Sequence, residues 1–120
     1  ISFIIRGAAF KVYSNLGPGL LESVYEKALA YELETLHLQV HCQKGIPMVY
    51  QGIPFDIGFR MDLEVEGKVV VEIKSVEKLT DVHHKQLLTY IRLANKKLGL
   101  LINFNTIDLK TSIIRIVNNL

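Results

Sequence analysis

Two apolar runs that flank an amphipathic segment constrain this fold more than any other feature of the sequence. Val69–Lys74 is rich in β-branched residues and Leu98–Phe104 is apolar almost throughout, so both are typical of buried strands. Between them, an apolar stripe with helical spacing begins after Thr80, which suits an N-cap, and ends at Lys96. This strand, helix, strand pattern predicts two parallel strands joined by a right-handed crossover.

Two helices and a set of strands are predicted before this unit. Apolar positions recur with helical spacing over residues 1–16, Gly17-Pro18-Gly19 interrupts them, and the spacing resumes over about residues 20–36. Over residues 38–76 the period shortens towards two, with turn signals at Gln51-Gly52 and Glu66-Gly67. Pro47 and Pro54 each lack a backbone donor, so their segments should be edge strands or bulges. Residues 110–117 predict a last strand.

The element order helix, helix, strands, helix, strand, strand predicts one α/β domain over residues 1–120, with helices flanking a mixed β-sheet. A hydrophobic content of 49% and a net charge of +2 exclude disorder as the main state. The single Cys42 excludes an internal disulfide and favours a reducing cytoplasm. The apolar stretch over residues 98–104 is far shorter than the roughly 20 residues that cross a bilayer, so we expect no membrane association.

Charge is divided unevenly along the chain. Residues 1–73 hold six Lys/Arg against nine Asp/Glu, and residues 74–120 hold eight against three, which gives net charges of −3 and +5. An acidic half could carry metal ligands and a basic half could meet phosphates, although solvated surface charge also explains such an asymmetry.

An acid-x-Lys triplet ends the most apolar predicted strand. Glu72 and Lys74 are separated by one residue, so they share a face of the sheet. If the turn before this strand is a three-residue loop with Gly67 in the left-handed conformation, Asp62 joins the same face; a strict two-residue turn would separate them. The alternative to a functional site is an exposed cross-strand ion pair.

Two carboxylates in one site repel each other unless a cation lies between them. Their hard oxygen ligands suit Mg²⁺ or Mn²⁺, and such a metal activates water. Lys74 could then orient the attacking water or stabilise charge on a phosphoryl oxygen. We therefore expect Asp62 and Glu72 to hold the metal.

These residues carry a resemblance to known nucleases. Asp62, Glu72 and Lys74 resemble the PD-(D/E)xK core, with Met61 where the name of that superfamily has Pro. The stretch Gly19-Leu20-Leu21-Glu22-Ser23-Val24-Tyr25 resembles the signature of the GxxExxY protein family, a branch of that superfamily, and the similarity covers nearly the whole chain. The resemblance implies a restriction-endonuclease-like, three-layer core.

The resemblance also implies roles for particular residues. Asp62 and Glu72 would bind metal together with the backbone carbonyl of Ile73, and Lys74 would be catalytic. Glu22 would join the acidic cluster as a further catalytic and metal-binding carboxylate. Gln86 and Tyr90 are similar to a QxxxY element whose side chains approach nucleic acid or help order the site. Further candidate phosphate contacts flank the site or follow it on the basic half: Arg60, Lys78, Lys85, Arg92, Lys96 and Lys97.

The function predicted from these observations is a Mg²⁺- or Mn²⁺-dependent nuclease that hydrolyses phosphodiester bonds. DNA is the first candidate substrate, and RNA stays open. Two alternatives remain: a weakly active or inactive module of the same fold that binds nucleic acid or protein, and a small-molecule phosphohydrolase, which would lack a Gly-rich phosphate loop. Because the sequence has few groove-reading elements, a homodimer or a protein partner is also considered.

Overall fold

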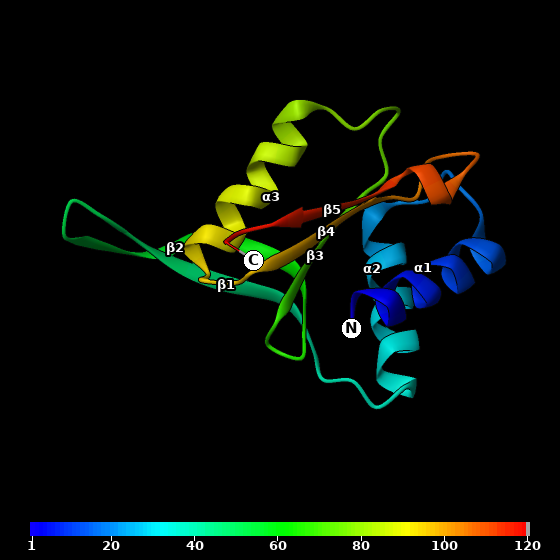
Figure 1. Cartoon of the computed structure of the whole chain (residues 1–120), viewed down its shortest axis with the longest axis horizontal. Coiled ribbons are helices and arrows are strands. Elements are labelled where there is room, and N and C mark those ends of the chain that lie inside the picture. The colour runs from blue at the N-terminus through cyan, green and yellow to red at the C-terminus, as the bar shows by residue number, and fades with distance from the viewer. Residues whose placement is uncertain (120) are drawn as a thin grey trace.

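A computed structural model describes residues 1–119, apart from the side chains of residues 56 and 57. Its elements are α1 (Ser2–Leu16), α2 (Glu22–Thr35), β1 (Val40–Tyr50), β2 (Ile53–Val65), β3 (Val69–Lys74), α3 (Asp81–Leu93), β4 (Leu98–Asn103), the 3₁₀ helix η1 (Leu109–Thr111) and β5 (Ile113–Val117). Over this described part, one mixed sheet has the strand order β1-β2-β3-β4-β5, with helices on both of its faces (Figure 1). The predicted α/β class and order of elements are therefore confirmed.

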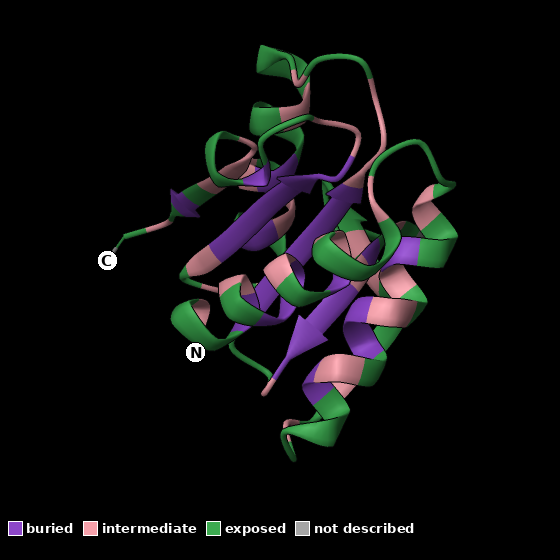
Figure 2. Ribbon diagram, turned by 90° about the vertical axis from the view of Figure 1, so that its right-hand side faces the viewer, coloured by how far each residue is buried: buried purple, intermediate pink, exposed green. Residues whose placement is uncertain are grey.

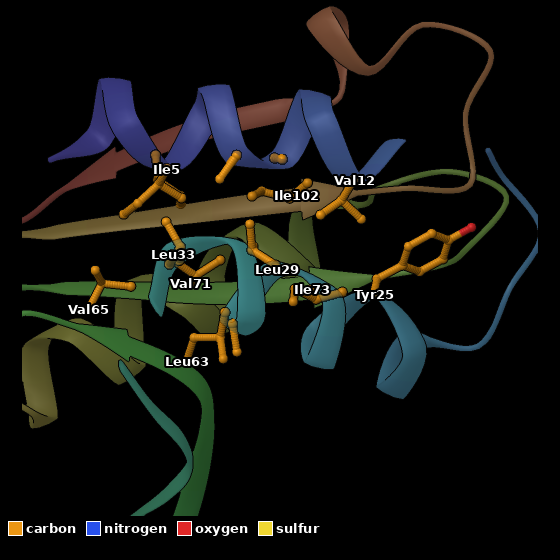
Figure 3. Close-up of a cluster of buried hydrophobic side chains, with 14 of the residues drawn as sticks. Ile5, Val12, Tyr25, Leu29, Leu33, Leu63, Val65, Val71, Ile73 and Ile102 are labelled. Atoms are coloured by element: carbon orange, nitrogen blue, oxygen red, sulfur yellow. The ribbon is translucent and has the colours of Figure 1, made fainter. Parts of the chain in front are cut away.

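Helices α1 and α2 cover one face of the sheet. Their apolar residues recur every three or four positions, so each helix presents one buried stripe. Ile5 and Leu29 pack in a cluster with Val71 of β3 and Ile102 of β4 (Figure 3). Burial is concentrated on β3, on β4 and on the inner sides of the helices (Figure 2). This layer forms the larger of the two cores.

Helix α3 covers the opposite face and completes a three-layer arrangement. Leu87 and Ile91 are buried and pack with Val70 and Leu101. Gly99 allows a close approach here, because a Cβ atom at this position would lie 3.0 Å from the Cγ atom of Leu87. The sheet is thus buried on both sides where β3 and β4 run, as their uninterrupted apolar sequences require.

Strands β3 and β4 are parallel, as the crossover pattern predicts. Their register runs from Val69 opposite Leu98 to Lys74 opposite Asn103. Asn103 is 4% exposed, and its side-chain amide accepts from the Val76 N–H and donates to the Val76 carbonyl. The buried asparagine therefore fixes the backbone immediately after Lys74.

The β1–β2 hairpin is long, and its tip projects beyond the rest of the sheet (Figure 1). Its tip is formed by Gln51 and Gly52, with φ angles of 49° and 79°, as the turn signal predicts. The β1–β2 register shifts between Ile46 and Met48, so Pro47 lies at an irregularity of an edge strand, also as predicted.

The last strand is shorter than the sequence predicts. Residues 110 and 111 belong to η1, and β5 begins only at Ile113. The Asp108 carboxylate accepts from the Lys110 N–H at 3.1 Å, which caps this short helix. This bond uses the Lys110 N–H, which in a strand would have donated to a neighbouring strand. The predicted strand over residues 110–117 is therefore wrong in its first part.

Candidate active site

Asp62 and Glu72 lie opposite each other on β2 and β3. Both Glu66 and Gly67 have positive φ angles, of 56° and 64°, and Val65 pairs with Val69 across the loop. The register continues with Leu63 opposite Val71, which brings the next residues of the two strands, Asp62 and Glu72, together. Of the two turns that the sequence leaves open, the structure therefore has the three-residue loop, with Gly67 in the left-handed conformation.

Each carboxylate is hydrogen-bonded to the backbone of the other strand. The Asp62 N–H donates to Glu72 Oε2 at 2.8 Å, and the Ile73 N–H donates to Asp62 Oδ2 at 2.8 Å. Backbone N–H donors at these distances make well-formed, charge-assisted bonds. The two side chains therefore have a fixed geometry that comes from the strands themselves.

Strand β2 changes faces at Asp62. Leu63 belongs to the core under α1 and α2, whereas Met61 belongs to the core under α3. In a regular strand these two residues would share a face, because side chains alternate with a period of two. The backbone of β2 therefore rotates at Asp62, and the side-chain-to-backbone bonds with β3 form at that point.

The carboxylate pair is short of positive charge. Glu72 is 5% exposed, and burial, followed by the charge of Asp62, raises its pKa to about 8 despite the lowering effect of Lys74. Burial also raises the pKa of Asp62, and the charge of Glu22 adds to this effect. A proton is therefore retained on the pair near neutral pH unless a cation replaces it.

The tyrosine of the GxxExxY stretch orders the loop between α1 and α2. The Tyr25 hydroxyl donates to the Gly17 carbonyl at 2.6 Å and accepts from the Leu20 N–H at 3.1 Å. Its ring is fully buried and stacks on Phe104, with centroids 4.4 Å apart. Gly19 has a φ of 94°, which favours glycine. Tyr25 is thus a core residue with a satisfied hydroxyl.

Glu22 of α2 is hydrogen-bonded to the backbone just after the end of β3, one residue beyond Lys74. Its Oε2 atom accepts from the Ser75 N–H at 3.0 Å, and the Ser75 hydroxyl donates to the Leu20 carbonyl at 2.6 Å. Glu22 is close enough to Asp62 for its charge to raise the pKa of that residue. Among the described residues, no three His, Cys, Asp or Glu side chains form a group that could hold a metal ion. Glu22 is therefore at the margin of the Asp62–Glu72 pair.

Two further polar residues belong to the site, and neither was assigned to it from the sequence. The Gln43 side-chain amide donates to Glu26 Oε1 at 2.6 Å and to Asp62 Oδ1 at 3.2 Å. Glu26 follows Glu22 by one helical turn, a spacing visible in the sequence. Gln43 has no such signal, because its place depends on the β1–β2 register.

Helix α3 contributes an aromatic residue near the carboxylates. Tyr90 stacks on Phe59 of β2, with centroids 4.1 Å apart. Burial raises the pKa of the Tyr90 phenol, and the charges of Glu72 and Asp62 raise it further. Gln86, one turn earlier, is exposed. Of the QxxxY pair, Tyr90 therefore lies half-buried beside the site, and Gln86 is exposed on the same helix.

Five of the six predicted phosphate contacts are exposed, and Lys96 is half-buried. Arg60 is close to the site, because its guanidinium donates to the Gln43 carbonyl at 3.3 Å. Lys96 instead pairs with the buried Glu64, at 3.5 Å. The other four candidates are exposed: Lys85 and Arg92 lie on α3, Lys78 precedes this helix and Lys97 follows it.

One of three comparisons with known proteins found a match. The sequence model of one family, described as the PD-(D/E)XK nuclease superfamily, matches residues 1–116. The chain belongs to this superfamily. Searches among curated proteins and among solved structures gave no match.

Membership of the PD-(D/E)XK superfamily confirms the resemblance at that level and accounts for the mixed sheet flanked by helices. It supports a nuclease-type function, and divalent metals are typical of these nucleases. As for membrane association, none of the helices among the described residues combines the length and apolar character that a bilayer crossing requires.

Proposed function

We propose that this PD-(D/E)XK domain is a Mg²⁺- or Mn²⁺-dependent nuclease of the GxxExxY branch that hydrolyses phosphodiester bonds of nucleic acid. The observation that supports this most is the pair formed by the half-buried Asp62 and the buried Glu72, whose raised pKa values the nearby charge of Lys74 does not offset. A pair of carboxylates with raised pKa values costs stability, so it is expected where a bound cation offsets that cost.

The donor atoms at the site are of the chemical kind that a hard divalent cation prefers, and among the described residues Glu22 would have to move towards Asp62 and Glu72 to complete a group of three carboxylates. Asp62, Glu72 and the Ile73 carbonyl would hold the cation, and Glu22 would contribute from the end of β3. All of these donors are oxygens, which Mg²⁺ and Mn²⁺ prefer. When bound, such a metal lowers the pKa of a water molecule and polarises a phosphoryl oxygen.

The chain's own side chains divide the remaining work. Lys74 would orient the attacking water and stabilise the negative charge that develops on the phosphoryl oxygen. Tyr90 and the exposed Gln86 would contact the nucleic acid next to the scissile bond. Arg60, Lys78, Lys85 and Arg92 would contact phosphates, which gives salt-dependent binding without sequence preference.

Cleavage by purified protein tests this proposal. Single-stranded DNA, duplex DNA and RNA should be incubated with Mg²⁺, Mn²⁺ or EDTA. We expect cleavage with either metal and none with EDTA. Lys74→Ala should reduce the rate about 10²–10⁴-fold, because it removes an electrostatic and proton-positioning group. Asp62→Ala should abolish both cleavage and Mn²⁺ binding.

The chain offers a matched control for the lysine. Asp108-Leu109-Lys110 repeats the acid-x-Lys pattern at η1, and Lys110 is exposed. Lys110→Ala should cleave like the wild type, and Lys74→Ala should still bind Mn²⁺ in calorimetry. Unchanged cleavage in Lys74→Ala would show that the activity arises elsewhere, and no cleavage of any substrate by wild type with bound metal would favour the inactive binding module.

A further inference from the structure

Gln43 has a backbone conformation that few glutamines adopt. It lies in β1 between the pairs Cys42–Leu63 and Lys44–Met61, so it faces Asp62 across the hairpin. Its φ angle is 53°, in the left-handed region that is uncommon for residues other than glycine, asparagine and aspartate. Such conformations persist where surrounding contacts require them. The side-chain contacts of Gln43 therefore stabilise this backbone conformation.

The Gln43 amide joins two carboxylates from different elements. Its Nε2 atom donates to Glu26 Oε1 of α2 at 2.6 Å and to Asp62 Oδ1 of β2 at 3.2 Å. An amide NH₂ group has two hydrogens, so both bonds can form at once. A neutral donor between two acids lets both stay close, and it connects the projecting hairpin to α2.

Both oxygens of Asp62 are consequently held. The Ile73 N–H of β3 donates to Oδ2, and Gln43 of β1 donates to Oδ1. Because β2 changes faces at this residue, regular strand pairing alone does not orient its side chain. Side-chain partners of this kind fix the direction in which a ligand oxygen points.

We propose that Gln43 is a positioning residue for Asp62, and that Glu26 is the acceptor that keeps the Gln43 amide in place without itself binding metal. This inference rests on the proposed metal-dependent function of the same site. Loss of a partner that orients a metal ligand typically weakens metal affinity about 10–100-fold. The same loss should loosen the bond from the Ile73 N–H to Asp62 in the metal-free protein.

Gln43→Asn is the most informative variant. Asparagine keeps the amide and tolerates a positive φ better than glutamine does, but it is one methylene too short to reach both carboxylates. Gln43→Ala removes the amide entirely. Gln51→Asn is the matched control, because Gln51 also has a positive φ, of 49°, but lies at the exposed tip of the same hairpin.

Two measurements decide the outcome. Calorimetric titration with Mn²⁺ should show affinity about 10–100-fold weaker for both Gln43 variants and unchanged for Gln51→Asn. Amide hydrogen exchange by NMR in EDTA should show faster exchange at Ile73 in the Gln43 variants only. Unchanged Ile73 exchange in both Gln43 variants would overturn the inference, whatever happens to Mn²⁺ affinity.

The metal-free measurement separates this inference from the proposed function. If the wild type binds no Mn²⁺, the metal site fails, and Ile73 exchange still decides whether Gln43 positions Asp62. Glu26→Gln tests whether Glu26 acts only as an acceptor for the Gln43 amide. This variant should weaken Mn²⁺ binding far less than Asp62→Asn does. Equal loss of Mn²⁺ binding in these two variants would identify Glu26 as a ligand and refute its assigned role.

Discussion

Replacing Glu72 by glutamine should stabilise the metal-free protein at alkaline pH. Burial and the charge of Asp62 raise the pKa of Glu72 from 4.5 to about 8 in the folded state. An acid whose pKa is raised by folding makes its full contribution to the free energy of unfolding at pH values below its pKa in the unfolded state, here near 4.5. That contribution is lost as the pH rises towards its pKa in the folded state, about 8. Glutamine has nearly the same shape and cannot ionise, so it avoids this loss.

The magnitude follows from the size of the pKa change. Each tenfold change in an ionisation constant is worth about 1.4 kcal/mol, so a rise from 4.5 to about 8 corresponds to roughly 5 kcal/mol. Because the site can relax when Glu72 ionises, we expect Glu72→Gln to raise the free energy of unfolding by roughly 2–5 kcal/mol at pH 8. At pH 5 the gain should be much smaller.

Urea unfolding followed by circular dichroism, in EDTA at pH 5 and pH 8, measures this difference. Glu64→Gln is the matched control, because Glu64 is also buried, at 2% exposed, yet its pKa is lowered. Burial would raise the pKa of Glu64, but the hydrogen bond from Lys44 and the charge of Lys96 outweigh that effect. Its amide variant should therefore be destabilised at pH 8.

The same substitution by glutamine should therefore raise the free energy of unfolding at pH 8 when it is made at Glu72 and lower it when it is made at Glu64. If Glu72→Gln lowers the free energy of unfolding equally at both pH values, the burial of an ionisable Glu72 beside the charge of Asp62 is the wrong explanation. Saturating Mn²⁺ should favour the wild type, since a ligand at 100 times its Kd stabilises the folded state by about 2.7 kcal/mol. The variant should gain much less.

Three further predictions concern other parts of the molecule. Tyr25→Phe keeps the stacked ring but leaves the Gly17 and Leu20 groups without the hydroxyl, so thermal unfolding should show a loss of roughly 1–3 kcal/mol; an unchanged Tm would contradict this. Gly99→Val should cost roughly 1–3 kcal/mol by overpacking against Leu87, and a stability equal to wild type would show that α3 can move away. With the cleavage-deficient Lys74→Ala protein, adding Arg92→Ala should reduce the salt slope of nucleic-acid binding by about one, whereas Arg115→Ala should not; equal slopes would remove Arg92 from the interface.

The sequence predicts the parts of this protein that depend on short-range patterns. The crossover from Val69 to Phe104 follows from helical and strand periodicities. The meeting of Asp62 with Glu72 follows once the loop at Gly67 has three residues, a choice that the sequence leaves open against a two-residue turn. Each needs information from within one supersecondary unit.

Contacts between distant segments could not be predicted in the same way. The bond from the Ser75 N–H to Glu22 depends on how α2 docks against the end of β3. Gln43 reaches Asp62 only because its backbone is left-handed, which no residue pattern near it indicates. The resemblance to a nuclease family points to Glu22 but says nothing of the backbone N–H that it accepts.

The hydrogen bond between Glu22 and the backbone at the end of β3 has a consequence for how the domain can be divided. Asp62, Glu72 and Lys74 lie within one hairpin of thirteen residues, 62–74, which looks like a portable unit. Yet the backbone after Lys74 is closed by Glu22 from α2 and by Asn103 from β4. A hairpin grafted onto another protein would carry the superfamily's signature residues without the Glu22 and Asn103 side chains that hold the backbone after Lys74. The geometry of the site therefore depends on the whole folded chain and not on the motif alone.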